Sequence, residues 1–214
     1  MIVDKKLYDN YIEILKEELL PAMGCTEPIA VAYAAAKARS ALGIMPEHIK
    51  VYCSGNIVKN VKGVIVPNSN GMKGIAVAAI LGVVAGQENR TLEVLNSVND
   101  DAIEQTRQLV QTDYCDCNLV EGEENLYIRV EVTANGEAAL AEIKTRHDHI
   151  SRIEKNGKTL FNQNDLKETF AVDKSGLNLK DILAFADSVN LEDIRAVLER
   201  QIQYNSEIAK EGLE

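Results

Sequence analysis

The first candidate for chemistry is Cys25, which lies in the run Gly24-Cys25-Thr26-Glu27-Pro28. Thr26 is a good N-cap and Pro28 is tolerated in a first helical turn, so we expect a helix to begin directly after the cysteine. A thiol beside a helix N-terminus meets the positive end of the helix dipole, which lowers its pKa. We therefore predict that Cys25 has the lowest pKa of the four cysteines. The alternative is a buried, inert cysteine, and Glu27 would oppose thiolate formation.

The second candidate is an anion site in two Gly- and Asn-rich segments, residues 54–63 and 67–74. Turns of this composition that lead into a helix expose backbone N–H groups to an anion, and their lysines add positive charge, so a carboxylate would fit. The GxxxxGK[ST] order of a nucleotide-binding loop is missing, which disfavours a nucleotide. The alternative is a pair of ordinary turns whose Asn and Gly residues adopt left-handed conformations.

The third candidate is the histidine pair His147 and His149, which would share one face of a strand. The chain has only one other histidine, His48, so a zinc site lacks ligands and we predict no metal site. Paired donors for a substrate carboxylate or carbonyl are the functional interpretation, and hydrogen-bonded histidines at a strand edge are the alternative. Cys115 and Cys117 would also share a strand face, and we interpret them as core or incidental thiols.

Helices are expected to position the first two candidates. Apolar residues at helical spacing predict an amphipathic helix over residues 4–20, which Pro21 ends. Residues 29–38 and 75–85 are almost wholly small or branched apolar residues, which is typical of helices that are buried on most sides. We expect these two apolar helices to pack on each other or on a sheet.

Strands are expected to supply that sheet. Branched residues predict short strands at His48–Cys53 and Gly63–Val66. Over residues 113–161 the apolar period changes to two, which predicts an antiparallel sheet, and Asn156-Gly157 marks a hairpin turn.

The remaining patterns are helical, and together they set the fold class. Further helices are predicted over residues 89–111 and near residues 164–170, 178–188 and 191–212. The expected fold is α+β: an antiparallel sheet packed with Ala-rich buried helices, followed by a C-terminal helical segment. We divide the chain into an α+β domain at residues 1–161 and a helical segment at residues 162–214.

Composition narrows the class of protein. The 214 residues carry a net charge of −10, which argues against nucleic acid or an anionic membrane as a partner. Residues 1–80 carry a net charge of +2 and residues 81–214 a net charge of −12. We therefore expect a small anionic ligand to bind within residues 1–80. The N-terminus lacks the apolar region of a secretory signal, and we expect a cytoplasmic protein with reduced thiols.

Three segments together resemble one known family. They are Pro21–Ala32, the block Ser54–Asn60 with Gly71–Gly74, and His147–Ile150. They resemble the N-terminal half of the L-cysteine desulfidase family, which is related to the bacterial iron–sulfur L-serine dehydratases. The resemblance covers essentially the whole chain. Its first part is similar to the serine dehydratase β-domain, and its last helices are similar to the start of the helical α-domain.

The resemblance implies a lyase that removes sulfide from L-cysteine, or water from L-serine, to give pyruvate and ammonia. Family members hold a 4Fe-4S cluster whose three cysteine ligands lie in the C-terminal half. The base that takes the α-proton is the cysteine of the GCTEP block, which falls on Cys25. Cys53, Cys115 and Cys117 do not match the ligand pattern, so we expect no cluster in this chain and no activity from it alone. The residues expected to bind substrate are Thr26, Glu27, Ser54, Asn56, Lys59, Asn60, Asn70, Gly71, Lys73, His147 and His149.

A different class of function remains open. A non-catalytic amino-acid-binding or regulatory module would use the same Asn, Gly and Lys turns to sense a carboxylate, and it would not need a thiolate at Cys25. A purely structural domain for oligomer assembly would bind no ligand. For the enzyme we expect a small amino-acid substrate, a homo-oligomer, and no nucleic-acid or membrane partner.

Overall fold

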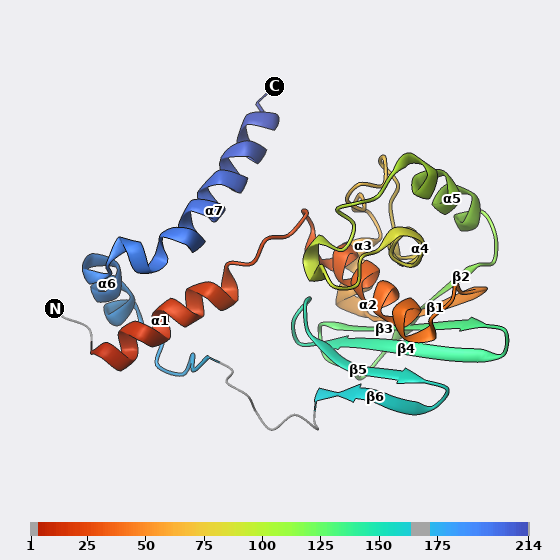
Figure 1. Cartoon of the computed structure of the whole chain (residues 1–214), viewed down its shortest axis with the longest axis horizontal. Coiled ribbons are helices and arrows are strands. Elements are labelled where there is room, and N and C mark those ends of the chain that lie inside the picture. Colours follow the sequence, from red (N-terminus) through yellow and green to blue (C-terminus); the bar gives the residue numbers. More distant parts are fainter. Residues whose placement is uncertain (1–3, 164–171, 214) are drawn as a thin grey trace. The chain divides into compact units, whose positions relative to one another are not determined.

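The computed structural model describes residues 4–163 and 172–213, and the chain divides into two compact units (Figure 1). One unit comprises Ala22–Lys167, and the other comprises Met1–Pro21 with Glu168–Glu214. The first unit is a sheet with helices, and the second is helical, so the predicted α+β class is confirmed. Within the described ranges, no helix is both long enough and apolar enough to span a membrane.

A six-stranded sheet forms the larger unit, with the strand order β2-β1-β3-β4-β5-β6. Its strands are β1 (His48–Ser54), β2 (Cys115–Val120), β3 (Tyr127–Ala134), β4 (Glu137–Lys144), β5 (Ile150–Lys155) and β6 (Lys158–Asn162). All neighbours are antiparallel except β1 and β2, which are parallel. The predicted antiparallel sheet is confirmed except at this pair, which is parallel because a long helical connection carries the chain from β1 back to the start of β2.

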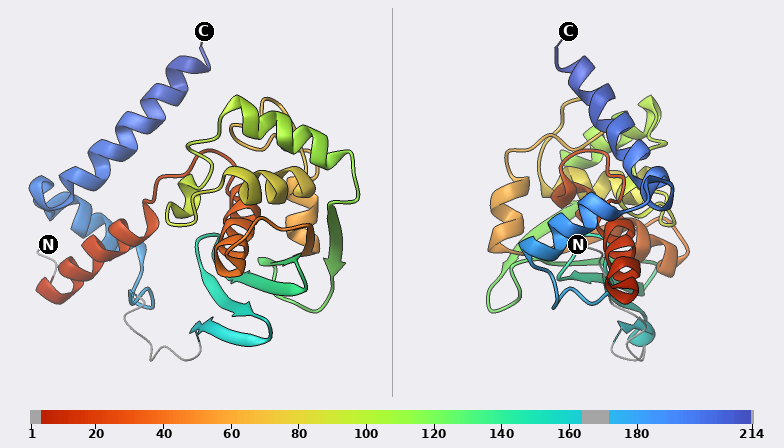
Figure 2. Two further views of the ribbon diagram at one scale, coloured as in Figure 1. Left: turned by 45° about the vertical axis from the view of Figure 1, so that its right-hand side comes forward. Right: turned by 90° about the vertical axis from the view of Figure 1, so that its left-hand side faces the viewer.

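Helices cover one face of the sheet (Figures 1 and 2). The two apolar helices are α2 (Thr26–Leu42) and α4 (Ile75–Ala85), and they pack on each other as well as on strands, as predicted. Their contact is close, since a Cβ built on Gly82 would lie 2.3 Å from the carbonyl oxygen of Ala32. Only glycine allows this approach, so Gly82 sets the position of α2 and of the cysteine at its start.

Several predicted boundaries change in the structure. The segment after β1, predicted as a turn, is the helix α3 (Gly55–Val61), and the predicted strand Gly63–Val66 is reduced to one bridge between Ile65 and Lys73. Residues 89–111 form a short 3-10 helix, η1 (Thr91–Glu93), and α5 (Asp100–Val110). The side chain of Asn99 accepts a hydrogen bond from the backbone of Ala102 and so starts α5 as a separate helix.

The helical unit consists, in its described part, of α1 (Lys5–Glu18), α6 (Leu179–Ser188) and α7 (Leu191–Glu211). Its core joins Tyr11 and Ile14 of α1 to Phe185 and Ile194, and the rings of Tyr11 and Phe185 are 5.2 Å apart. The predicted helices at 4–20, 178–188 and 191–212 are confirmed, whereas the one near 164–170 lies outside the described residues.

Candidate functional site

The loop before α2 places Cys25 at the start of that helix. Cys25 itself is the N-cap, in an extended conformation and without a side-chain cap, so the prediction that Thr26 fills this position is wrong by one residue. The cause lies in Gly24, whose φ of +130° is open mainly to glycine and turns the chain directly into the helix. A Cβ on Gly24 would lie 3.6 Å from Pro67, which puts the start of the 67–74 segment beside the cysteine.

Glu27 joins Cys25 to α3. The Sγ of Cys25 donates a hydrogen bond to Oε2 of Glu27 at 3.0 Å. The side-chain amide of Asn60 donates to the other oxygen, Oε1, at 3.2 Å. The hydrogen bond from Cys25 lowers the pKa of Glu27, and His147 lowers it further through its charge. The structure thus brings together three of the predicted site residues, Cys25, Glu27 and Asn60, at the start of α2 and in α3.

The protonation states differ from the sequence prediction. Burial, followed by the hydrogen bond to Glu27, raises the pKa of Cys25. The prediction that Cys25 has the lowest thiol pKa is therefore wrong: among the described cysteines it is Cys117 whose pKa is lowered, by the thiol of Cys115. Desolvation and the nearby carboxylate outweigh the helix dipole at Cys25. The hydrogen bond from the thiol lowers the pKa of Glu27, so the resting site holds a neutral thiol against a carboxylate.

The segment 67–74 is a set of left-handed turns. Asn70 and Gly71 have φ values of +54° and +83°, so the turn interpretation is confirmed. The side chain of Asn68 donates to the carbonyl of Leu95 at 3.0 Å, which fixes the segment to the unit. Lys73 is exposed at the end of this segment. Carboxylate binding by Asn70, Gly71 and Lys73 stays a prediction.

Ser54 and Asn56 lie in a different hollow, of about 350 Å³, between the start of α3 and residues 119–125. The hydroxyl of Ser54 is buried and donates to the carbonyl of Asn125 at 2.6 Å. Glutamates at positions 121, 123 and 124 line the same hollow, and their negative charge opposes a carboxylate there. Lys59 is exposed on α3.

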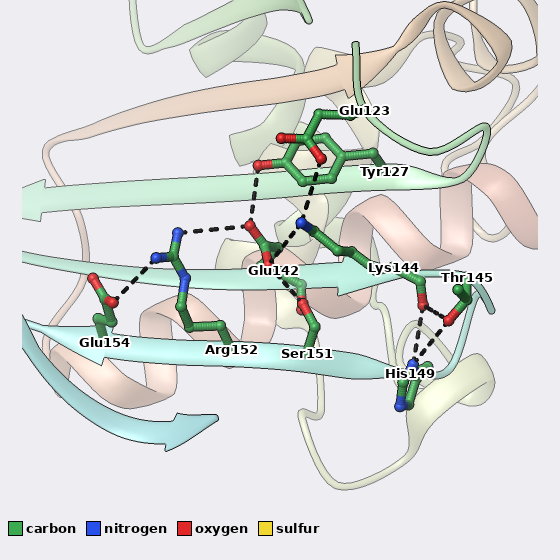
Figure 3. Close-up of polar contacts among 9 residues, drawn as sticks. All are labelled: Glu123, Tyr127, Glu142, Lys144, Thr145, His149, Ser151, Arg152 and Glu154. Carbon is green, nitrogen blue, oxygen red and sulfur yellow. Dashed lines mark hydrogen bonds and ion pairs between the residues drawn. The ribbon is translucent and has the colours of Figure 1, made fainter. Parts of the chain in front are cut away.

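The two histidines after β4 lie in a turn. Residues 145–149 form a turn instead of a strand, so the expectation that His147 and His149 share a strand face is wrong. A φ of +65° at Thr145 starts this turn. The Nδ1 of His149 lies 3.0 Å from the carbonyl oxygen of Lys144 and 3.2 Å from the hydroxyl of Thr145 (Figure 3). His149 therefore stabilises the turn.

A buried carboxylate that the sequence analysis missed lies on the face of the sheet away from the helices (Figure 3). Glu142 is 7% exposed and accepts hydrogen bonds from Ser151 at 2.7 Å and from Tyr127 at 3.1 Å. Arg152 and Lys144 form ion pairs with it at 3.6 and 3.7 Å. The strand alternation places Glu142 on the polar face, but the strand register that surrounds it with partners cannot be deduced from the sequence.

Metal-binding donors do not gather in the described part of the chain. No group of three or more His, Cys, Asp or Glu residues there could hold a metal ion. Cys53 is buried in β1, and burial raises its pKa to about 12, while Cys115 and Cys117 lie in β2. These residues therefore do not provide the donor set that a 4Fe-4S cluster needs.

Comparison with known proteins identifies relatives that share the name UPF0597 protein. Identity is 46% over 209 residues with the protein of Lachnoclostridium phytofermentans, which covers 97% of this chain and 50% of the relative. Identity is 45% over 206 residues with the protein of Finegoldia magna, covering 95% of this chain and 49% of the relative. It is 38% over 216 residues with the protein of Treponema denticola, covering 100% of this chain and 50% of the relative. The chain therefore spans about half the length of the curated relatives it matches. No family model and no solved structure matches it.

Proposed function

Because the chain belongs to the UPF0597 family over nearly its whole length, and spans about half of each relative, we propose that it forms the substrate-binding half of an amino-acid lyase. The reaction is elimination of sulfide from L-cysteine, or of water from L-serine, to give pyruvate and ammonia. The observation that carries the proposal is the partly buried Cys25 thiol, hydrogen-bonded to Glu27, whose other oxygen is held by Asn60. This arrangement supplies a proton acceptor together with a group that controls its protonation.

Glu27 also suits the ammonium group of an amino acid. Its carboxylate is ionised and partly buried, which strengthens attraction to a cation. A substrate ammonium beside Glu27 adds positive charge, and a nearby positive charge lowers the pKa of a thiol. The Cys25 proton can then leave to solvent, while Glu27 stays ionised beside the ammonium. Substrate binding would thus generate the thiolate that the resting protein lacks.

The Cys25 thiolate then removes the proton from the substrate α-carbon. The electron pair of that C–H bond forms the Cα=Cβ double bond, and the leaving group departs from the β-carbon with its own bonding pair. The resulting 2-aminoacrylate takes up water and releases ammonia, leaving pyruvate. The donor set for a 4Fe-4S cluster is not formed by the described residues, so departure of the leaving group is assigned to the half of the longer relatives that this chain does not represent.

The substrate carboxylate is assigned to the basic, Asn- and Gly-rich segment after Pro67. The place of Pro67, 3.6 Å from where a Cβ on Gly24 would lie, supports this assignment, because it sets the segment beside Cys25. Lys73 is exposed at the far end of the segment and supplies the positive charge. The acidic lining of the hollow at Ser54 makes that hollow the poorer place for a carboxylate.

The test uses the longer Lachnoclostridium phytofermentans relative, purified without oxygen, with pyruvate release measured from L-cysteine and from L-serine. Replacing the residue aligned with Cys25 by Ser or Ala should lower kcat by at least about 100-fold, since a general base contributes roughly that much or more. Unchanged thermal melting shows that the variants fold. Equal turnover in the Ser variant would refute the role of Cys25. Binding of L-serine without pyruvate from the unmodified relative would instead support the non-catalytic binding module.

A further inference from the structure

Two cysteines that the proposed function does not use lie side by side on the edge of the sheet. Cys115 and Cys117 belong to β2, one of the two edge strands of the sheet (Figure 1). They lie opposite Ile49 and Val51, whose side chains are fully buried on the helix-covered face. Residues opposite each other in a sheet point to the same face, so both thiols lie on that side. Cys117 is exposed and Cys115 is partly exposed, so both can be reached from solvent at the sheet edge.

The two thiols lie close together along β2. Cys115 and Cys117 are two residues apart on one strand, and their places opposite Ile49 and Val51 put both side chains on the same face. The buried thiol of Cys53 on β1 lies close enough to influence Cys115 as well. Two thiols on one face of an edge strand, both reachable from solvent, are suited to bind a soft metal cation, because thiolates are the ligands such ions prefer.

Strand geometry favours a bridging ion over a disulfide. Residues two apart on a strand have Cα atoms about 6.6 Å apart, near the upper limit for a disulfide, whose Cα atoms are usually about 5.5–6 Å apart. A disulfide also holds its sulfurs about 2.05 Å apart, whereas two metal–sulfur bonds of about 2.3 Å span up to about 4.6 Å. The bridging ion therefore requires less contraction of β2.

Ligand number selects the kind of ion. Zinc requires four ligands, and the described residues contain no group of three or more suitable side chains. The neighbouring Asp116 does not add a third, because its side chain points to the opposite face and lies 3.5 Å from His48. We propose that Cys115 and Cys117 form a two-coordinate site for a soft monovalent cation, for which Cu(I) is the probe.

The test titrates the reduced 214-residue chain, without oxygen, with Cu(I) supplied as its acetonitrile complex and competed by bicinchoninate. We expect one tightly bound Cu(I) per chain, with X-ray absorption showing two sulfur neighbours. Loss of a supporting group near a metal costs about 10–100-fold in affinity, so Cys115→Ser and Cys117→Ser, which remove a ligand, should each cost more than about 100-fold.

Cys25→Ser is the matched control, because it removes a thiol elsewhere and leaves the β2 pair intact. The proposal predicts unchanged Cu(I) affinity in this variant. Equal losses in Cys25→Ser and Cys117→Ser, retention of full affinity in Cys117→Ser, or absence of competitive binding by the unmodified chain would each overturn it. Circular dichroism of each variant before titration separates lost binding from lost folding.

Discussion

The contact between α2 and α4 predicts that Gly82→Ala destabilises the larger unit. A Cβ at this position would lie 2.3 Å from the carbonyl oxygen of Ala32 and 2.7 Å from its Cα. Alanine gains about 1 kcal/mol over glycine in a helix interior, whereas overpacking a core costs about 1–3 kcal/mol. The clashing atoms are backbone, so no side-chain rotation relieves them, and we expect the upper end of that cost. The net loss is then about 2 kcal/mol.

The measurement is hydrogen exchange of peptides from α2 during urea titration, which confines the result to this unit. Gly63→Ala is the matched control, since a Cβ there meets nothing within 4 Å, and surface changes usually stay within about 0.5 kcal/mol. Because α2 begins next to Cys25, Gly82→Ala should also alter the alkylation rate of that thiol. Equal stability of the Gly82→Ala variant and the unmodified chain would refute the account of how α2 is positioned.

Four further predictions concern charge and surface. Glu27→Gln should shift the alkylation profile of Cys25 to lower pH, since the carboxylate raises the pKa of the thiol, and an unmoved profile would contradict this. The folded pKa of Glu27 is lowered, so its contribution to stability is complete above the unfolded value of about 4.3 and is lost as the pH falls through the folded value. The stability difference between the unmodified chain and Glu27→Gln should therefore narrow in acid urea titrations, and a constant difference would argue against it. Glu142→Ala should lower the free energy of unfolding by about 1–3 kcal/mol, because it leaves the buried partners of this carboxylate unpaired. Thermal melting of the unmodified chain, Glu142→Ala and the isosteric variant Glu142→Gln measures this loss. Ile202 and Ile208 are 63% and 68% exposed on α7, and exposed apolar side chains of this kind can mediate self-association. If the chain self-associates through them, the double variant Ile202→Asp with Ile208→Asp should have a lower mass in sedimentation than the unmodified chain. An unchanged mass would rule out an interface through these two residues.

Periodicity was enough to predict most of the fold. The amphipathic helix α1, the apolar helices α2 and α4 and the hairpin at Asn156 each follow from local patterns that need no distant partner. The parallel pairing of β1 with β2 does not follow, since it depends on where a long connection returns to the sheet. The helix α3 was missed because its Gly and Asn residues have low helix propensity, which packing of Ile57 and Val61 into the core overrides.

The candidate site was predictable in its residues more than in its chemistry. Cys25, Glu27 and Asn60 were all named from motifs, and the structure brings them together through hydrogen bonds. The direction of the Cys25 pKa shift was wrong, because helix position is visible in the sequence while burial and the thiol–carboxylate hydrogen bond are not. His149 was grouped with His147 by spacing alone, and the turn after β4 separates them.

Ligand protection of Cys25 tests most directly whether this site receives an amino acid. The reduced chain is alkylated at fixed pH with increasing L-serine, and the rate at each cysteine is followed by peptide mass spectrometry, with D-serine as the stereochemical control. The account predicts that L-serine changes the rate at Cys25 in a saturable manner, while D-serine has no effect and the rate at Cys117 stays constant. An unchanged rate at Cys25, or equal changes at Cys25 and Cys117, would contradict the account.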